Sequence, residues 1–376
     1  MTPYVILDDA IVQVRAALIG KDGPERIALS GLSDGPAAGA IVSAQVTKRL
    51  GGHEDCIVTL SDGSEAHLSG RRGGRDPDLT QGASFIAEVV RAGDIDKRPE
   101  VRRVAADTAL TPYWDEIDQF LSTLPPGFDG DIRVATPQLW SRRVSTWQAQ
   151  FAHLKDAFKQ DFQEPGAKFA DSGADDALLA LMSERWPLPG GGDIRFGSVS
   201  GITVFDINTG PATGQKGALA ANLSAARALP QLISIGAFGG LMVADFIDLK
   251  AHGDQGRVLE AFDAASAALG LKIKRTGWSK FGMVELQAHR QGNDLSAQLL
   301  SREGAGYHAP RIALLTLQKA LALLPRPMVL RVAEPVQRWL AAHEGVTLLS
   351  ERLSLSITVV AEDDMSYGAW ALEPAP

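Results

Sequence analysis

Two strand-like segments of the sequence place carboxylate side chains directly beside apolar residues. In the segment ITVFDIN, Asp206 follows an apolar run and Asn208 comes two positions later; in LMVADFID, Asp245 follows a similar run and Asp248 comes three positions later. A carboxylate buried among such residues is costly unless it is paired or bound to a cation. Because a strand has a side-chain period of two, Asp206 and Asn208 are expected on one face.

Asp206 and Asp245 are 39 positions apart, which is room for one crossover helix between two neighbouring strands. The carboxyl ends of such strands are where α/β proteins place ligands. Two carboxylates and one amide oxygen form an all-oxygen set that suits Mg²⁺ or Mn²⁺ and does not suit zinc. The alternative is that each Asp caps a helix or turn at its strand end, but two matched strands favour the metal interpretation.

A cluster of basic residues follows Asp245 and Asp248 in the sequence. Between positions 271 and 290 the local charge is +4, from Lys272, Lys274, Arg275, Lys280 and Arg290 against Glu285, with Trp278 and Phe281 interleaved. Positive charge beside a magnesium site is what a phosphodiester substrate requires.

Two further basic segments are less specific. The loop TGPATGQKG lacks the spacing of a phosphate-binding loop, so its glycines indicate a turn and Lys216 is at most a phosphate contact. The segment KRPEVRR, which contains Lys97, is more typical of a solvated surface than of a binding site.

The elements that carry these residues follow from periodicity. From residue 194 the pattern is strand, helix, strand, helix, strand, and 309–361 alternates again, so the second half is α/β. Short strands with turn signals over 40–105 predict a small β-barrel, which follows a strand and its return over 3–19. Residues 113–160 are expected to be helical, with an apolar stripe that packs in the core: Trp140, Val144, Trp147, Phe151 and Leu154.

Composition excludes several classes of protein. The 376 residues suggest two or three domains, and a net charge of −8 excludes a protein coated in positive charge. A single cysteine, Cys56, excludes an internal disulfide framework and a multi-cysteine zinc site, and is expected in the barrel core. The start has no basic region and no apolar run reaches the length of a membrane span, so a soluble, cytoplasmic protein is expected. No zinc-binding histidine motif or serine nucleophile elbow occurs.

Four segments in order resemble the ribonuclease E/G endoribonucleases: ITVFDINTG, AANLSAA, FGGLMVADFIDL and WSKFGMVEL. The resemblance implies that Asp206 and Asp245 bind Mg²⁺ and that Asn208 supports the site. It leaves the roles of Asp248 and of Asn222, in the second segment, open.

The resemblance also implies a multi-subdomain fold that mixes α/β and β parts. Residues 1–38 and 110–187 are similar to an RNase-H-like subdomain, and 39–109 to an OB-type RNA-binding barrel inserted in it. Residues 188–300 resemble a DNase-I-like nuclease subdomain, and 301–376 a small C-terminal α/β domain that makes dimer contacts in the family. Lys97 falls on a basic position at the junction of barrel and core.

Some family features are missing from the sequence. The 5′-monophosphate sensor would lie between 105 and 113, where only a few residues remain, and Lys272 falls on a basic position of that sensor's pocket. Ile57 and His67 occupy the positions of the barrel's RNA-stacking aromatics. No cysteine lies between 295 and 311, so a homodimer remains open but a zinc-linked assembly is not expected.

The sequence therefore predicts a Mg²⁺-dependent endoribonuclease that cleaves single-stranded RNA independently of its 5′ end, in RNA processing or decay. The residues expected to hold the RNA backbone are Lys97, Lys216, Lys272, Lys274, Arg275 and Lys280. One alternative is an RNA-binding protein of the same fold that has lost most or all catalysis. Another is a metal-dependent phosphohydrolase for small nucleotides, which would need a closed pocket.

Overall fold

A computed structural model of the chain describes all residues except 1, 12, 31–35, 51–54, 73–77, 94–97, 112–113, 211–213, 290–293, 301–307, 310, 314–315, 317–325 and 376. The chain divides into two compact units, the first formed by residues 1–6, 17–27 and 167–300, and the second by 7–16, 28–166 and 301–376. We describe each unit by itself.

The first unit contains a six-stranded sheet in the order β11-β12-β13-β14-β16-β15. The strands are β11 (Arg185–Pro187), β12 (Gly192–Val199), β13 (Ile202–Thr209), β14 (Gly240–Asp245), β15 (Lys274–Arg275) and β16 (Met283–Ala288). Only β13 and β14 pair in parallel; the other pairs in this sheet are antiparallel. The predicted strand–helix–strand order is therefore confirmed, with β13 and β14 as direct neighbours.

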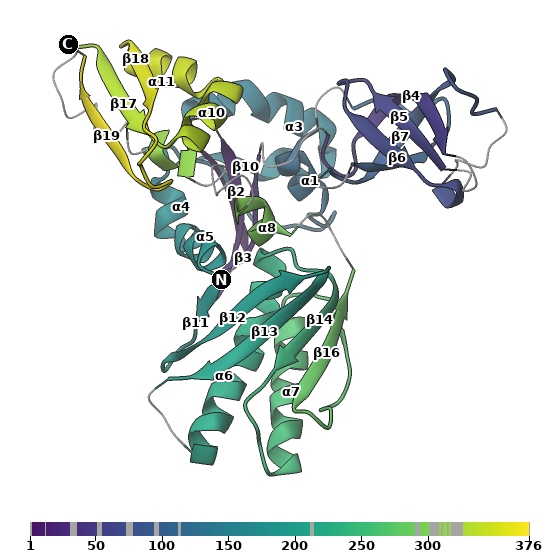
Figure 1. Cartoon of the computed structure of the whole chain (residues 1–376), viewed down its shortest axis with the longest axis vertical. Helices are drawn as coiled ribbons and strands as arrows, with labels where there is room; N and C mark the ends of the chain where they lie inside the picture. The colour runs from purple at the N-terminus through teal and green to yellow at the C-terminus, as the bar shows by residue number, and fades with distance from the viewer. Residues whose placement is uncertain are drawn as a thin grey trace. The chain divides into compact units, whose positions relative to one another are not determined.

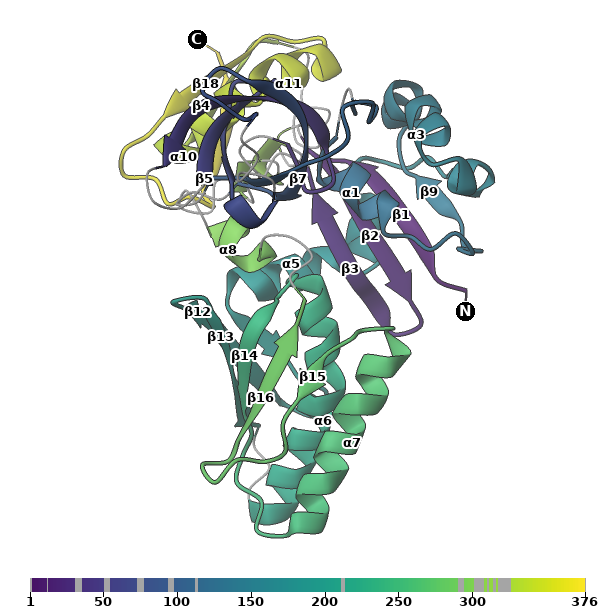
Figure 2. The same ribbon diagram turned by 90° about the vertical axis from the view of Figure 1, so that its right-hand side faces the viewer.

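Two long helices, α6 (Gly214–Ile235) and α7 (His252–Ala268), lie against one face of this sheet (Figures 1 and 2). Buried residues of the strands point toward these helices, including Phe196 and Phe205, whose rings lie 5.5 and 5.6 Å from the ring of Phe238. The opposite face carries no helix in these views (Figure 2). Three shorter helices complete this unit: α4 (Ala167–Asp171), α5 (Ala174–Met182) and α8 (Leu295–Leu300).

A five-stranded sheet has the order β10-β9-β1-β2-β3. Its strands are β1 (Tyr4–Asp9), β2 (Val14–Gly20), β3 (Gly23–Leu29), β9 (Ile132–Val134) and β10 (Phe158–Gln160). The last two pair in parallel within a region expected to be helical, and they were missed because three residues are too few to show a strand period.

The helical stripe in the second unit packs in the core as predicted. The helices are α1 (Glu116–Ser122), α2 (Pro137–Leu139) and α3 (Ser145–Gln150), with a π-helical turn at Trp140–Val144. Four members of the stripe are buried, namely Val144, Trp147, Phe151 and Leu154, whereas Trp140 is half-buried.

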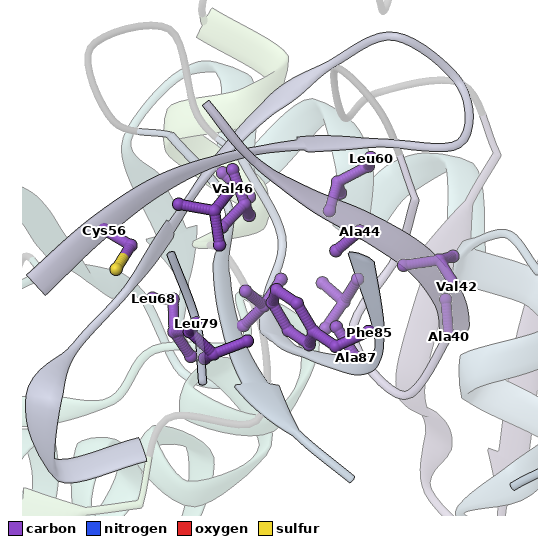
Figure 3. Close-up of a cluster of buried hydrophobic side chains, with 14 residues drawn as sticks. Ala40, Val42, Ala44, Val46, Cys56, Leu60, Leu68, Leu79, Phe85 and Ala87 are labelled. Atoms are coloured by element: carbon purple, nitrogen blue, oxygen red, sulfur yellow. The ribbon is translucent and has the colours of Figure 1, made fainter. Parts of the chain in front are cut away.

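The predicted small barrel is confirmed as a closed barrel in the order β4-β5-β6-β8-β7. Its strands are β4 (Ile41–Leu50), β5 (Asp55–Leu60), β6 (Glu65–Leu68), β7 (Ser84–Arg91) and β8 (Glu100–Arg103). Alternate side chains fill the interior, and Cys56 is one of them, with no exposed surface (Figure 3). The single cysteine is thus a core residue, as expected.

The C-terminal part of the second unit is a three-stranded sheet, β18-β17-β19, with two helices. The elements are β17 (Met328–Val332), α10 (Glu334–Ala342), α11 (Gly345–Leu353), β18 (Ile357–Ala361) and β19 (Trp370–Pro374). Most of the helix expected over 311–324 lies outside the described residues. No helix in the described ranges is long and apolar enough to cross a membrane.

Candidate active site

Asp206 of β13 and Asp245 of β14 are direct cross-strand partners. The parallel register pairs them residue to residue, so both side chains leave the same face of the sheet. That face is the one opposite α6 and α7, and both carboxylates are exposed. The expectation that they would be buried among apolar neighbours is wrong, because the buried neighbours Phe205 and Ala244 point to the helices while the acids point to solvent.

Asn208 holds Asp206 from the same strand. Its Nδ2 donates to Asp206 Oδ2 at 3.0 Å and lies 3.4 Å from Asp193 Oδ1. Asp193 is buried, faces Asn208 across the β12–β13 pair and accepts from Arg185 Nε at 2.6 Å. The amide of Asn208 thus bridges two carboxylates, which fixes its oxygen and nitrogen in one orientation.

Two further residues lie on this face, Asp193 and Arg195, and neither was predicted from the sequence. The β12–β13 hairpin turns at Ser200 and Gly201, both with positive φ, and this two-residue turn pairs Arg195 with Asp206. The side chain of Arg195 is 67% exposed, and its Nε lies 3.7 Å from Asp193 Oδ1. A two-residue turn between β12 and β13 implies this strand register, and the register would have predicted that both residues share a face with Asp206.

Asn222, on the helix-covered side of the sheet, holds the segment that carries Asp245. It is fully buried on α6, donates through Nδ2 to the Ile247 carbonyl at 2.7 Å and accepts from the Ile247 N–H at 3.0 Å. Ile247 lies between Asp245 and Asp248, so this side chain fixes the backbone that carries both acids. The role that the sequence left open for Asn222 is therefore a positioning one.

The electrostatics of the site favour a cation. Partial burial, reinforced by the negative charges of Asp206 and then Asp248, raises the pKa of Asp245. Within the described part of the chain, neither Asp206 nor Asp245 forms an ion pair with a basic side chain. Two like charges held side by side repel each other, and a bound cation would relieve that repulsion.

The donor set fits a hydrated divalent cation. Among the described residues, no group of three or more His, Cys, Asp or Glu side chains forms a ready-made metal cage. Mg²⁺ commonly uses one or two carboxylates and fills its other positions with water and substrate phosphate oxygens. Asp206 and Asp245 on an open face offer that arrangement.

The structure distributes the predicted basic residues over several positions. Lys274 lies on the open face, in register with Gln287, and Lys280 is exposed in the turn before β16. Lys216, in the first turn of α6, and Lys272 are exposed, while Lys97 lies outside the described residues.

Arg275 needs a correction. It pairs with buried Leu286, so it lies on the helix side of the sheet, and its guanidinium donates to both carboxylate oxygens of Asp263 on α7 at 2.8 and 2.5 Å. An arginine engaged in this way is a structural residue, and the prediction that it binds RNA loses its support.

On the barrel, Ile57 and His67 are cross-strand partners, and His67 Nε2 lies 3.2 Å from Asp55 Oδ2. The basic residues of KRPEVRR that the structure describes are partly neutralised, because Arg98 pairs with Glu65 and Arg102 with Glu88. These pairs favour the interpretation of that segment as a solvated surface.

Comparison with known proteins supplies the family. Residues 114–291 match the model of the Ribonuclease E/G family. The chain is 32% identical to Ribonuclease E of Nostoc sp. over 123 residues, which are 32% of this chain and 18% of that protein. It is 30% identical to Ribonuclease E of Synechocystis sp. over 122 residues, 31% of this chain and 18% of that protein. It is 26% identical to Ribonuclease G of Haemophilus influenzae over 127 residues, 33% of this chain and 26% of that protein.

The chain thus spans about a fifth to a quarter of the length of these relatives. The matched region includes β12, β13, α6, β14, α7 and β16, and therefore both acids and the residues that contact them on the sheet. Residues 114–291, just under half of the chain, thus carry its likeness to the ribonuclease E/G family.

Proposed function

We propose that this protein is a Mg²⁺-dependent endoribonuclease that cleaves single-stranded RNA on the open face of the six-stranded sheet. The observation that carries the proposal is the register of β13 and β14, which sets Asp206 beside Asp245 with no basic partner for either in the described residues. Mn²⁺ has the same ligand preferences and is the natural substitute. The family match and the two relatives named Ribonuclease E support RNA as the substrate.

In the proposed mechanism, Asp206 and Asp245 would hold the cation, and Asn208 keeps the Asp206 carboxylate oriented through its 3.0 Å hydrogen bond. The cation, when bound, activates water and stabilises the charge that develops on a phosphodiester. Arg195, in register with Asp206, is placed to contact a phosphate of the bound strand. Asn222 holds the segment that carries Asp245 and thereby fixes the separation of the two carboxylates.

The remaining parts of the proposal concern domains and RNA ends. The barrel's closed five-strand order supports an OB-type RNA-binding module at 39–109. The division into an RNase-H-like part (1–38 and 110–187), a DNase-I-like part (188–300) and a C-terminal domain (301–376) belongs to this proposal as well. Only residues 104–115 separate β8 from α1, so we propose that cleavage does not depend on a 5′-monophosphate.

Cleavage of a labelled, unstructured RNA, with Mg²⁺ and with EDTA, tests the proposal. We expect Asp206→Ala and Asp245→Ala to abolish cleavage, while Glu260→Ala, an exposed acid on α7, retains it. RNA carrying a 5′-monophosphate or a 5′-hydroxyl should be cut at similar rates. Full activity of both Asp variants would refute the mechanism.

A second function, RNA binding without catalysis, is favoured by the Ile57–His67 pair, which places no Phe, Tyr or Trp at the family's stacking positions on the barrel. RNA affinity without metal-dependent cleavage in the wild-type protein would decide for it.

A further inference from the structure

Phe281 is an aromatic side chain that lies mostly in solvent. It is 84% exposed, more than any other large hydrophobic residue in the described part of the chain. Burying a phenylalanine side chain is worth about 1.5–3 kcal/mol, and that gain is forgone here. Isolated exposed apolar residues are common on proteins, so exposure by itself assigns no role.

The turn that presents Phe281 is fixed by its own hydrogen bonds. The Ser279 hydroxyl accepts from the N–H of Phe281 at 3.3 Å and of Met283 at 3.1 Å, and the Ser279 N–H donates to the Met283 carbonyl at 2.9 Å. Gly282 completes the turn with a φ of +83°, which a residue with a side chain rarely adopts. Phe281 therefore projects from a defined turn.

The same turn is packed against the end of β14. The ring of Trp278 lies 5.4 Å from the ring of buried Phe246, which directly follows Asp245. Trp278 is thereby used in packing, whereas Phe281 remains available.

The turn also borders the acids. Met283, two residues after Phe281, is the register partner of Asp245, and a Cβ placed on Gly282 would lie 3.1 Å from Asp248 Oδ1. Exposed Lys280 is the other neighbour of Phe281. An exposed ring and an exposed ammonium group thus sit beside the carboxylates that we propose as the cleavage site.

We infer that Phe281 stacks on a base of the bound single-stranded RNA and so holds the nucleotide next to the phosphate at Asp206 and Asp245. The inference rests on the proposed function and adds to it a residue that contacts one base of the bound RNA. A phenyl ring stacks on any base, so the contact selects unpaired, flexible RNA and tolerates every base identity.

The test uses the full chain and a fluorescein-labelled, unstructured oligoribonucleotide. Affinity is measured by anisotropy in EDTA, and kcat and KM by cleavage in Mg²⁺. Phe281→Ala should weaken binding roughly 5- to 150-fold, the range expected for one lost base–aromatic stack. Phe281→Trp should restore it, and Leu179→Ala, which removes an exposed leucine of the same unit, should leave it unchanged.

Abasic substitution at each nucleotide in turn makes the test specific. The wild-type protein should lose affinity at one position by the same factor as Phe281→Ala, and the variant should lose nothing further there. Equal affinity and equal KM of Phe281→Ala and wild type, with RNA still bound and cleaved, would overturn this inference alone. A change in sedimentation of Phe281→Ala with unchanged RNA binding would assign the ring to a protein contact and overturn it too. Absence of any RNA binding by the wild-type protein would overturn the proposed function as well.

Discussion

Replacing Asn222 with alanine should destabilise the first unit and loosen the segment that carries Asp245. The side chain makes two hydrogen bonds to one residue, at 2.7 Å to the carbonyl and 3.0 Å to the N–H of Ile247, from a fully buried position on α6. Each such bond contributes about 0.5–1.5 kcal/mol net, and a buried group left without a partner costs about 1–3 kcal/mol. We therefore expect a loss of about 2–3 kcal/mol of unfolding free energy.

Two measurements check this expectation. Urea unfolding gives the free-energy change, and hydrogen exchange of peptides that cover 245–249 gives its local part. A loss of about 2 kcal/mol corresponds to exchange about 30-fold faster at the Ile247 amide if exchange follows local opening. Ser224→Ala is the matched control, because its hydroxyl lies on the same helix and makes only a 3.3 Å contact with the Pro189 carbonyl.

The variant Asn222→Asp keeps the volume of the side chain and changes only its hydrogen bonding and charge. The isosteric carboxylate can still accept from the Ile247 N–H but places a negative oxygen against the Ile247 carbonyl, so it should be at least as destabilising near neutral pH. Protonation restores a donor, so the variant should recover stability as the pH falls. An unfolding free energy of Asn222→Ala within about 0.5 kcal/mol of wild type, together with unchanged exchange at 245–249, would refute the positioning role.

Three other predictions test the site and its surroundings. In thermal unfolding, saturating Mg²⁺ should stabilise the wild-type protein, by about 2.7 kcal/mol at a hundred times the dissociation constant. The Asp206→Asn protein should show no such shift and should be more stable than wild type without metal; an equal Mg²⁺ shift in both would exclude Asp206 as a ligand. Burial and then the charge of a neighbouring acid raise the pKa of Asp118 to about 7. The contribution of protonated Asp118 to stability is therefore complete below the unfolded pKa near 4 and is lost as the pH rises to about 7, so wild type should lose stability between about pH 4 and pH 7 in urea unfolding. Asp118→Asn should flatten this dependence, and parallel curves would contradict the assignment. Arg275→Ala should leave RNA affinity, measured by anisotropy, nearly unchanged, because the Arg275 guanidinium is bound to Asp263. Lys280→Ala should weaken RNA binding and reduce its dependence on salt. The reverse result would place the RNA on the helix side of the sheet.

The arrangement of β13, α6 and β14 was predictable from the sequence because its signals are long and regular. Each strand alternates over six to eight residues, and the helix between them has an apolar face, which together leave few topologies. The barrel was predictable for the same reason. The pair β9 and β10 was not, because two three-residue strands carry no period and are defined by their pairing with each other.

The exposure of the acids could not be read from the strands themselves. Ile202 and Val204, which share a face of β13 with Asp206, are 37% and 40% exposed. A strand pattern shows which side chains share a face, but which face is covered depends on where α6 and α7 pack. The role of Asn222 is hidden for a similar reason, since it depends on the contact of α6 with a residue 25 positions away. The sequence signal for this role was a single asparagine among the alanines of the segment AANLSAA.

The ends of β1 show why paired acids at a strand end are not sufficient for a metal site. Asp8 and Asp9 are both buried at the end of an apolar strand, and a sequence pattern would rank them with Asp206 and Asp245. Asp8 accepts from Arg15 Nη2 at 2.5 Å, and Asp9 Oδ2 accepts from both Arg142 and Arg352 at 2.9 Å.

Arg15 on the next strand, together with Arg142 and Arg352 from distant parts of the chain, thus satisfies Asp8 and Asp9, and no charge remains for a cation to neutralise. Asp206 and Asp245 have the opposite environment: they face each other, Asp248 adds to the negative potential at Asp245, and Asn208 donates a neutral hydrogen bond. The two pairs of acids therefore differ in their ion pairs: among the described residues, basic side chains bind Asp8 and Asp9, whereas none forms an ion pair with Asp206 or Asp245. That difference emerges only when strand register and side-chain partners are known.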